Sequence, residues 1–257
     1  MEKKIVFFDI DGTLLDFNKE LPESTRAAVK TLKENGVYVA IATGRAPFMI
    51  EEIRKELDID SYVCFNGQYV VFEDEIIYRN PLSKNKLHNL LEHTKEKQVP
   101  VVLMNEYGAR TTVPYSKHIE DSLRSFKLKH PEFDAEYHHH NDIFQSLLYC
   151  SEQEEKEYIQ EHTDLKFIRW HPICMDVVPF GGSKAIGINE FIKRAQFQLE
   201  NVYAFGDGLN DIEMLQTVGT GIAMGNAEKE LLKHADVVTT AVDEDGIYNG
   251  LLKVGLI

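Results

Sequence analysis

The beginning of the chain, where an apolar run ends in two aspartates, constrains its fold most. Residues 5–8 are four consecutive apolar residues, a pattern typical of a strand buried on both faces of a parallel sheet. Asp9 and Asp11 follow, and their carboxylates should converge because residues two apart in extended chain point to the same side. Gly12 then permits a sharp turn that can present backbone N–H groups to a phosphate. Two such carboxylates repel each other unless a cation joins them, so the stretch indicates a Mg²⁺-dependent phosphoryl-transfer site or, more simply, an acidic turn.

The next segments repeat the order of strand, polar motif and helix. Residues 22–35 have the spacing of an amphipathic helix, with a proline at its start and a glycine after its end. Apolar runs at 37–42 and 62–65 are expected to be buried strands, with a helix at about 46–57 between them. This βαβαβ series predicts an α/β fold with a doubly wound parallel sheet. A β-hairpin is expected at 70–72 and 76–78.

The middle of the chain has a different pattern. Helices are expected near 84–97, 115–130 and 152–162, mixed with strands at 99–104, 108–113, 143–150, 166–170 and 173–178. Residues 132–142 show no clear period, and their run of three histidines is expected to lie in a solvated loop. This mixture indicates an α+β unit, flanked by proline and glycine at 80–82 and 179–182. We therefore predict a core of residues 1–81 and 183–257 with an inserted domain of residues 82–182.

After residue 182 the α/β pattern resumes. The expected elements are a helix at 183–196, a strand at 201–205, a short helix up to 218, a strand at 221–224, a helix at 228–234, a strand at 237–240 and a helix at 246–254.

Composition limits the classes of partner. The formal net charge of −14 argues against nucleic-acid binding, which needs a basic surface. No stretch reaches the roughly 18 apolar residues of a membrane span. Cys64, Cys150 and Cys174 lie far apart in apolar runs, as expected for buried, reduced thiols. We therefore expect a cytoplasmic protein that contacts neither nucleic acid nor membrane, as a monomer or weak homodimer.

Polar residues follow several of the predicted parallel strands. Ligands of open α/β sheets bind at the carboxyl ends of the strands, so residues distant in sequence can meet there. Lys184, at the start of a helix, can supply a cation at the same edge. The residues expected to meet it are Asp9, Asp11, Thr43, Asn66, Asp207 and Asp211.

In the phosphoryl-transfer interpretation each carboxylate has its own task. Asp9 is expected to attack phosphorus and form an aspartyl-phosphate. Asp11 is expected to protonate the leaving oxygen and then to activate the water that hydrolyses the intermediate. Asp9 and Asp207 through their side chains, and Asp11 through its backbone carbonyl, are expected to hold Mg²⁺, which prefers oxygen ligands.

The remaining residues are expected to bind the phosphoryl group or to support the site. Thr43 through its hydroxyl, Gly44 through its N–H and Lys184 through its charge can cradle the phosphoryl oxygens. Asn210 and Asp211 would orient Lys184, or metal-bound water, from a second layer.

Together these motifs resemble those of a known superfamily. Residues 9–13 (DIDGT), residues 43–45 (TGR), Lys184 and residues 206–211 (GDGLND) are similar to the four motifs of the haloacid dehalogenase (HAD) superfamily, above all its Cof-type phosphatases. The resemblance implies a Rossmann-like core, an inserted α/β cap of type IIB, and Mg²⁺. It also implies a small phosphate monoester, such as a sugar phosphate or nucleotide-cofactor phosphate, as substrate. The Asp-x-Asp pair implies a phosphatase, because a dehalogenase releases a halide that needs no general acid.

Several alternatives stay open at this point. Arg45 could contact phosphate or substrate, or form an ion pair. Asn66 could contact substrate, although an Asn-Gly pair also suits a plain turn. A phosphomutase of the phosphomannomutase type would return the phosphoryl group to sugar instead of water. A non-catalytic sugar-phosphate sensor would bind without turnover, but it would need neither the nucleophile Asp9 nor the general acid Asp11.

Overall fold

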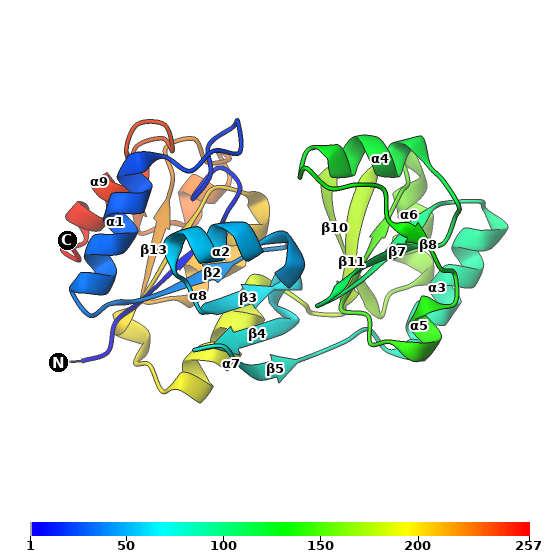
Figure 1. The fold of residues 1–257 in the computed structure, drawn as a ribbon, viewed down its shortest axis with the longest axis horizontal. Coiled ribbons are helices and arrows are strands. Elements are labelled where there is room, and N and C mark those ends of the chain that lie inside the picture. The colour runs from blue at the N-terminus through cyan, green and yellow to red at the C-terminus, as the bar shows by residue number, and fades with distance from the viewer. Residues whose placement is uncertain (1) are drawn as a thin grey trace. The chain divides into compact units, whose positions relative to one another are not determined.

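The computed structural model describes residues 2–257, and in it the chain divides into two compact units (Figure 1). The first contains the chain up to Arg45 together with Glu51–Arg79 and Ser183–Ile257. The second contains Ala46–Ile50 and Asn80–Gly182. These units place residues 46–50 and 80–81 with the second unit, whereas the sequence places them in the core. The functional boundaries at 81 and 183 stay a prediction.

The first unit is built on an eight-stranded sheet with the order β14-β13-β12-β1-β2-β3-β4-β5. From β14 to β3 all neighbouring strands are parallel, and β4 and β5 add an antiparallel edge. The strands are β1 (Ile5–Phe8), β2 (Tyr38–Ala42), β3 (Ser61–Cys64), β4 (Tyr69–Phe72), β5 (Glu75–Arg79), β12 (Val202–Gly206), β13 (Thr220–Ala223) and β14 (Val237–Val238). The sequence anticipated all eight, because each is an apolar run bounded by polar or turn-forming residues.

Helices cover both faces of this sheet, as expected for a doubly wound fold (Figure 1). Its helices are α1 (Glu23–Glu34), α2 (Glu51–Leu57), α7 (Lys184–Ala195), α8 (Ile212–Thr217) and α9 (Gly246–Lys253). One group is formed by α1 packing against α2 and α9, and the other by α7 packing against α8. Phe7 of the central strand meets Phe191 of α7 edge to face at 5.1 Å, so the strand that carries Asp9 is anchored in the core.

Two of the helices predicted between the strands of this sheet are wrong in part. The helix expected at about 46–57 is a 3-10 turn over Pro47–Met49 followed by α2. Proline disfavours helical backbone in the residue before it, and Ala46 is indeed extended, so no helix can begin before Pro47. The helix expected at 228–234 is only a 3-10 turn over Leu231–His234.

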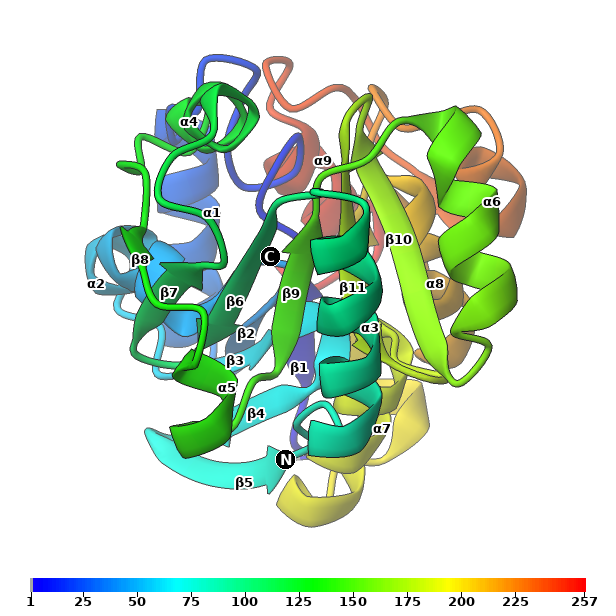
Figure 2. The ribbon, with the colours of Figure 1, turned by 90° about the vertical axis from the view of Figure 1, so that its right-hand side faces the viewer.

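The second unit is an α+β unit with a six-stranded sheet of order β10-β11-β9-β6-β7-β8 (Figure 2). Only β7 and β8 pair in parallel. The strands are β6 (Val101–Asn105), β7 (Gly108–Thr111), β8 (Glu132–Phe133), β9 (Gln145–Leu148), β10 (Leu165–His171) and β11 (Cys174–Pro179). The helices are α3 (Lys84–Glu96), α4 (Lys117–Arg124), α5 (Tyr137–His140) and α6 (Glu152–Glu161). Leu90 of α3 and Tyr158 of α6 belong to the same apolar core as Leu103 and Val177 of the sheet.

The segment 132–142, whose three histidines were expected to lie in a solvated loop, contains β8 and the short helix α5, which is formed by the histidine run and Tyr137. Tertiary contacts decide this, since Asn105 donates a 2.7 Å hydrogen bond to the Tyr137 hydroxyl and Arg110 lies over the Tyr137 ring. His138 is consequently buried. The three cysteines are free and buried, as predicted. None of the helices formed by residues 2–257 is long and apolar enough to cross a membrane.

Candidate active site

One buried cation, Lys184, lies between two carboxylates at the place where β1 and β12 end and α7 begins. Asp9 directly follows β1, and its backbone N–H donates to the Phe205 carbonyl of the neighbouring strand β12 (3.0 Å). Lys184, the first residue of α7, donates to Oδ1 of Asp9 (2.5 Å) and to Oδ1 of Asp211 (2.6 Å). The Lys184 side chain is fully buried. The sequence therefore placed these three residues together correctly, although they span 203 positions.

Asp207 adds a third carboxylate to this cluster. Its Oδ1 accepts a 2.8 Å hydrogen bond from the Thr13 hydroxyl. The other oxygen of Asp211 accepts from the backbone N–H groups of Asp207 (3.1 Å) and Gly208 (3.0 Å), so Asp211 braces both Lys184 and the loop after β12.

The electrostatics of the cluster favour a further cation. Burial, opposed by Lys184, raises the pKa of Asp9 to about 6. Burial and the charges of Asp9 and Asp211 raise the pKa of Asp207 to about 8. Although burial opposes it, the charges of Asp211 and Asp9 raise the pKa of Lys184. Three carboxylates share a single lysine, and a divalent cation would relieve their repulsion.

The donor atoms are also close enough to share one ion. One carboxylate oxygen from each of Asp9, Asp207 and Asp211 lies within 4.8 Å of the other two. Gly12 leaves room for the Asp207 carboxylate, because a Cβ at this residue, with its φ of +83°, would lie 2.3 Å from Oδ2 of Asp207. The Gly12 N–H donates to the Leu15 carbonyl (2.9 Å), and its predicted contact with phosphate stays a prediction.

Asp11 lies beside the cluster but is held by two cations of its own. Arg45 binds it with two hydrogen bonds, from Nε (2.9 Å) and from a terminal nitrogen (2.6 Å). Lys19 donates a third, of 2.5 Å. Burial favours the neutral acid, but the hydrogen bonds and charges of Arg45 and Lys19 outweigh it and lower the pKa of Asp11. Of the two interpretations of Arg45, this structure contains the ion pair.

The loops after β2 and β3 complete this edge of the sheet. Thr43 is buried and its hydroxyl accepts from the Arg45 N–H (3.1 Å), while its carbonyl accepts from the Asn66 N–H (3.1 Å). A Cβ at Gly44 would lie 3.1 Å from the Asn66 amide, so these two loops pack tightly. Asn210 is exposed, and within residues 2–257 its side chain makes no hydrogen bond to the Lys184 cluster.

Comparison with known proteins places this geometry in a family. A model for haloacid dehalogenase-like hydrolases matches residues 6–251. The chain belongs to this family. The hydrolase is 46% identical to a protein named "Putative phosphatase YkrA" from Bacillus subtilis (strain 168), and the match covers 100% of both chains.

Solved structures are similar along nearly the whole hydrolase. A hypothetical protein from Geobacillus kaustophilus HTA426 is 52% identical with a TM-score of 0.94, covering 99% of this chain and 100% of that one. The HAD subclass IIB sugar phosphatase BT4131 is 31% identical with a TM-score of 0.89, again covering 99% and 100%. These likenesses confirm the predicted fold, a parallel α/β core with a second, mixed sheet as cap.

Sequence reasoning missed two residues of this edge in the hydrolase. Lys19 lies in a loop with no motif around it, so nothing in the sequence pointed to its contact with Asp11. Asn226 follows β13 and donates to the Gly12 carbonyl (2.9 Å), while its own amide oxygen accepts from the Val242 N–H (2.8 Å). Its place in the loop that follows a parallel strand was a usable signal.

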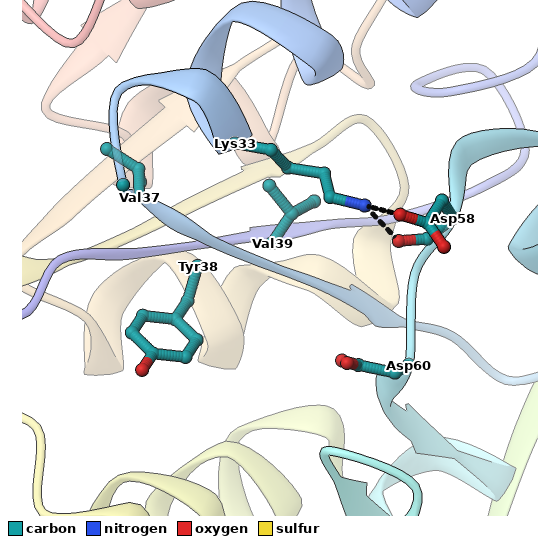
Figure 3. Close-up of a pocket in the computed structure, with 7 residues that line it drawn as sticks. Lys33, Val37, Tyr38, Val39, Asp58 and Asp60 are labelled. Atoms are coloured by element: carbon teal, nitrogen blue, oxygen red, sulfur yellow. Dashed lines mark hydrogen bonds and ion pairs between the residues drawn. The ribbon is translucent and has the colours of Figure 1, made fainter.

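The opposite edge of the same sheet carries a pocket of about 390 Å³ (Figure 3). It lies at the amino ends of β2 and β3, where Lys33 of α1 forms an ion pair with Asp58. Asp60 and Tyr38 also line the pocket. None of the predicted site residues is among its lining residues.

Proposed function

We propose that this hydrolase is a Mg²⁺-dependent phosphatase that cleaves small phosphorylated metabolites, such as sugar phosphates or nucleotide-cofactor phosphates, through a phosphorylated Asp9. The observation that carries the proposal is the buried cluster in which Lys184 bonds to Asp9 and Asp211 while Asp207 stands beside them. The phosphatase names of its relatives support the same class of reaction.

In the first step a carboxylate oxygen of Asp9 attacks phosphorus and the bond from phosphorus to the ester oxygen breaks. Lys184 holds the carboxylate in place, and at neutral pH its charge keeps Asp9 ionised against the effect of burial. Hydrolysis of the resulting acyl phosphate by water regenerates Asp9 and releases inorganic phosphate.

Asp11 moves the proton in both steps. It donates a proton to the departing ester oxygen and takes one from the attacking water. In the structure Arg45 and Lys19 favour its ionised form. The dianionic substrate therefore has to draw these two cations away from Asp11 before Asp11 can hold a proton. In this scheme Arg45 and Lys19 exchange one anionic partner for another.

The phosphoryl oxygens are held by groups around the same edge. Thr43 contributes its hydroxyl, Gly44 its backbone N–H and Lys184 its ammonium group. Asn66 packs against Gly44 and keeps that loop in position. Asn210, which is exposed, is assigned a supporting contact with substrate or metal-bound water.

Mg²⁺ would be held by the side chains of Asp9 and Asp207 and by the Asp11 carbonyl, with Asp211 behind them. When bound, the ion neutralises charge on the phosphoryl oxygens. The raised pKa values of Asp9 and Asp207 and the converging oxygens of Asp9, Asp207 and Asp211 fit a cation of this kind.

Phosphate release from a panel of phosphorylated sugars and cofactors tests the proposal. We expect release with Mg²⁺, none in EDTA, and none from Asp9→Asn at any Mg²⁺ concentration. The exposed Lys30→Ala, on the outer side of α1, is the control and should keep full activity. Full activity in chelator would overturn the metal assignment. Turnover of a sugar bisphosphate without phosphate release would identify a phosphomutase, and binding without turnover a sensor.

We propose further that the protein works in the cytoplasm as a monomer or weak homodimer, without nucleic-acid or membrane partners. The net charge of −14 supports the absence of nucleic-acid and membrane partners, because an acidic surface is repelled by nucleic acid and by anionic lipid.

A further inference from the structure

The second unit carries a cluster of imidazole and carboxylate groups that phosphoryl transfer does not use. It lies between α3 and α6, which pack on the same apolar core (Figure 2). Near its end α3 contributes His93, and α6 contributes Glu157 and Glu161, one turn apart. His162 follows α6 directly. We call these four residues the His93 cluster.

The donor atoms of the His93 cluster lie close enough together to converge on one ion. Nε2 of His93 lies 3.3 Å from Oε1 of Glu157, and Nδ1 lies 3.5 Å from Oε2 of Glu161. One donor atom from each of these three residues lies within 4.8 Å of the other two. In a tetrahedral zinc site with bonds of about 2.0–2.2 Å, neighbouring ligand atoms are about 3.3 Å apart. Glu157 and Glu161 approach different nitrogens of the His93 ring, so the exposed Glu161 side chain has to move from Nδ1 toward Nε2 for all three residues to reach one ion.

The His93 ring is held in place by its surroundings. Its side chain is only 11% exposed and packs on the Tyr158 ring at 4.7 Å between centroids. Nδ1 of His93 lies 3.1 Å from Nε2 of His162, a buried residue. A neutral His162 can accept the Nδ1 proton of His93, which leaves Nε2 of His93 with its lone pair toward Glu157. A hydrogen bond to one ring nitrogen commonly fixes which nitrogen binds a metal.

The charge around His93 is negative and only partly compensated. Two carboxylates and the C-terminal ends of two helices meet here, and helix C-termini carry partial negative charge. Lys97 offsets the charge of one carboxylate, because its Nζ lies 2.8 Å from Oε1 of Glu157. Its side chain is 49% exposed, so it can swing into solvent when another cation arrives.

We propose that His93, Glu157 and Glu161 bind a transition-metal ion of the Zn²⁺ type that ties α3 to α6, with His162 as the residue that orients the His93 ring. The mixed nitrogen and oxygen ligands favour Zn²⁺ over Mg²⁺, which takes oxygen ligands. The site shares no residue with the carboxylate cluster around Lys184, so the proposal stands whether or not the proposed function is correct.

Zinc titration of the full chain with Mg²⁺ in excess tests the proposal, with bound Zn²⁺ counted after gel filtration. We expect the wild type to retain one more Zn²⁺ than His93→Gln or Glu161→Gln. His162→Gln should weaken binding by about 10–100-fold, the usual effect of losing a residue that orients a ligand. Lys97→Met should strengthen binding, because it removes the competing cation. His118→Gln, an exposed histidine on α4, is the matched control and should change nothing.

A second readout separates the ligands from a general effect on folding. Zn²⁺ should raise the unfolding temperature of the wild type and of His118→Gln but not that of Glu161→Gln. Glu161 is 59% exposed, so this variant should fold even if His93→Gln does not. Equal Zn²⁺ retention by the wild type and Glu161→Gln would overturn the proposal and leave the His93 cluster as an ion-pair network.

Discussion

The two edges of the core sheet use charged side chains in opposite ways. At the carboxyl edge, Lys184 is fully buried and bonds to Asp9 and Asp211, which are also nearly or fully buried. At the amino edge, Lys33 pairs with Asp58 in the pocket of Figure 3, where the Asp58 side chain is 95% exposed. Both ion pairs join a lysine to an aspartate beside the same sheet, and they differ in their exposure to water.

The difference shows which edge carries a task beyond folding. An exposed pair such as Lys33 and Asp58 gains little, because water screens both charges. A buried pair must offset a large desolvation penalty and is therefore a poor way to stabilise a fold. Burial, together with repulsion among the carboxylates, raises the pKa values of Asp9 and Asp207, which reflects this cost. Burying such a cluster is reasonable where it binds a metal and a phosphoryl group.

Among substitutions that leave the nucleophile Asp9 in place, the largest effect is expected at Asp11, whose side chain is 33% exposed. Asp11→Asn should slow cleavage of sugar phosphates by about 10²–10⁴-fold, the usual range for a positioned acid. p-Nitrophenyl phosphate has a leaving group that needs no proton, so this variant should still phosphorylate Asp9. It should then stall, giving a burst of one p-nitrophenolate per enzyme in rapid-quench experiments. Equal, burst-free losses for both substrates would contradict an acid–base role.

Protein stability gives the most direct test of the difference between the buried Lys184 and the exposed Lys33. Lys184→Met leaves Asp9 and Asp211 buried without their cation, which should cost about 3–5 kcal/mol of the free energy of unfolding. Urea unfolding in EDTA, at pH 7.5, measures it. The loss should shrink at lower pH, where Asp9 takes up a proton. A change as small as that of the matched Lys33→Met would mean that burial does not separate the two edges.

Metal-free protein should lose stability as pH rises. The folded-state pKa values of Asp9 (about 6) and Asp207 (about 8) lie above their ordinary value of 3.8. Between pH 3.8 and each folded-state pKa, the folded protein holds a proton on that aspartate which the unfolded chain has already released. This contribution to stability is complete below pH 3.8 and is lost as pH rises through 6 and 8.

Mg²⁺ binds the ionised carboxylates, so the stabilisation that it adds should grow over the same pH range. At a concentration about 100 times its Kd it should raise the unfolding temperature by roughly 5–10 °C at pH 8.5, and by less at pH 5. Differential scanning fluorimetry at several pH values measures this. Asp207→Asn should lose most of the effect. A Mg²⁺ shift independent of pH would show that these carboxylates do not bind the ion.

The smallest effect is expected at the amino edge. Lys33→Met breaks an exposed ion pair and should shift the unfolding temperature by no more than about 2 °C. Its kcat/KM should equal that of the wild type, since Lys33 contacts no residue of the catalytic edge. A large loss of activity would show that the pocket of Figure 3 takes part in the reaction.

The sequence by itself determined the core sheet and which residues stand at the ends of its strands. Buried parallel strands are continuous apolar runs, and the carboxyl ends of such strands meet at one edge. Asp9, Thr43 and Asp207 could therefore be assigned to one place from their positions after such runs. The weaker predictions, at 46–57, 132–142 and 228–234, fell where short segments depend on proline or on tertiary contacts.

Only the tertiary structure decided the partners of the charged side chains. Nothing local in the sequence indicates that Lys19 binds Asp11, or that Asp11 is the residue that Arg45 binds. The His93 cluster joins residues about 70 positions apart on two helices whose pattern shows only an amphipathic face. Backbone periodicity sets which face of an element is buried. Side-chain packing between elements then decides which charged side chains form ion pairs. It also decides how deeply each of them is buried, and burial shifts its pKa.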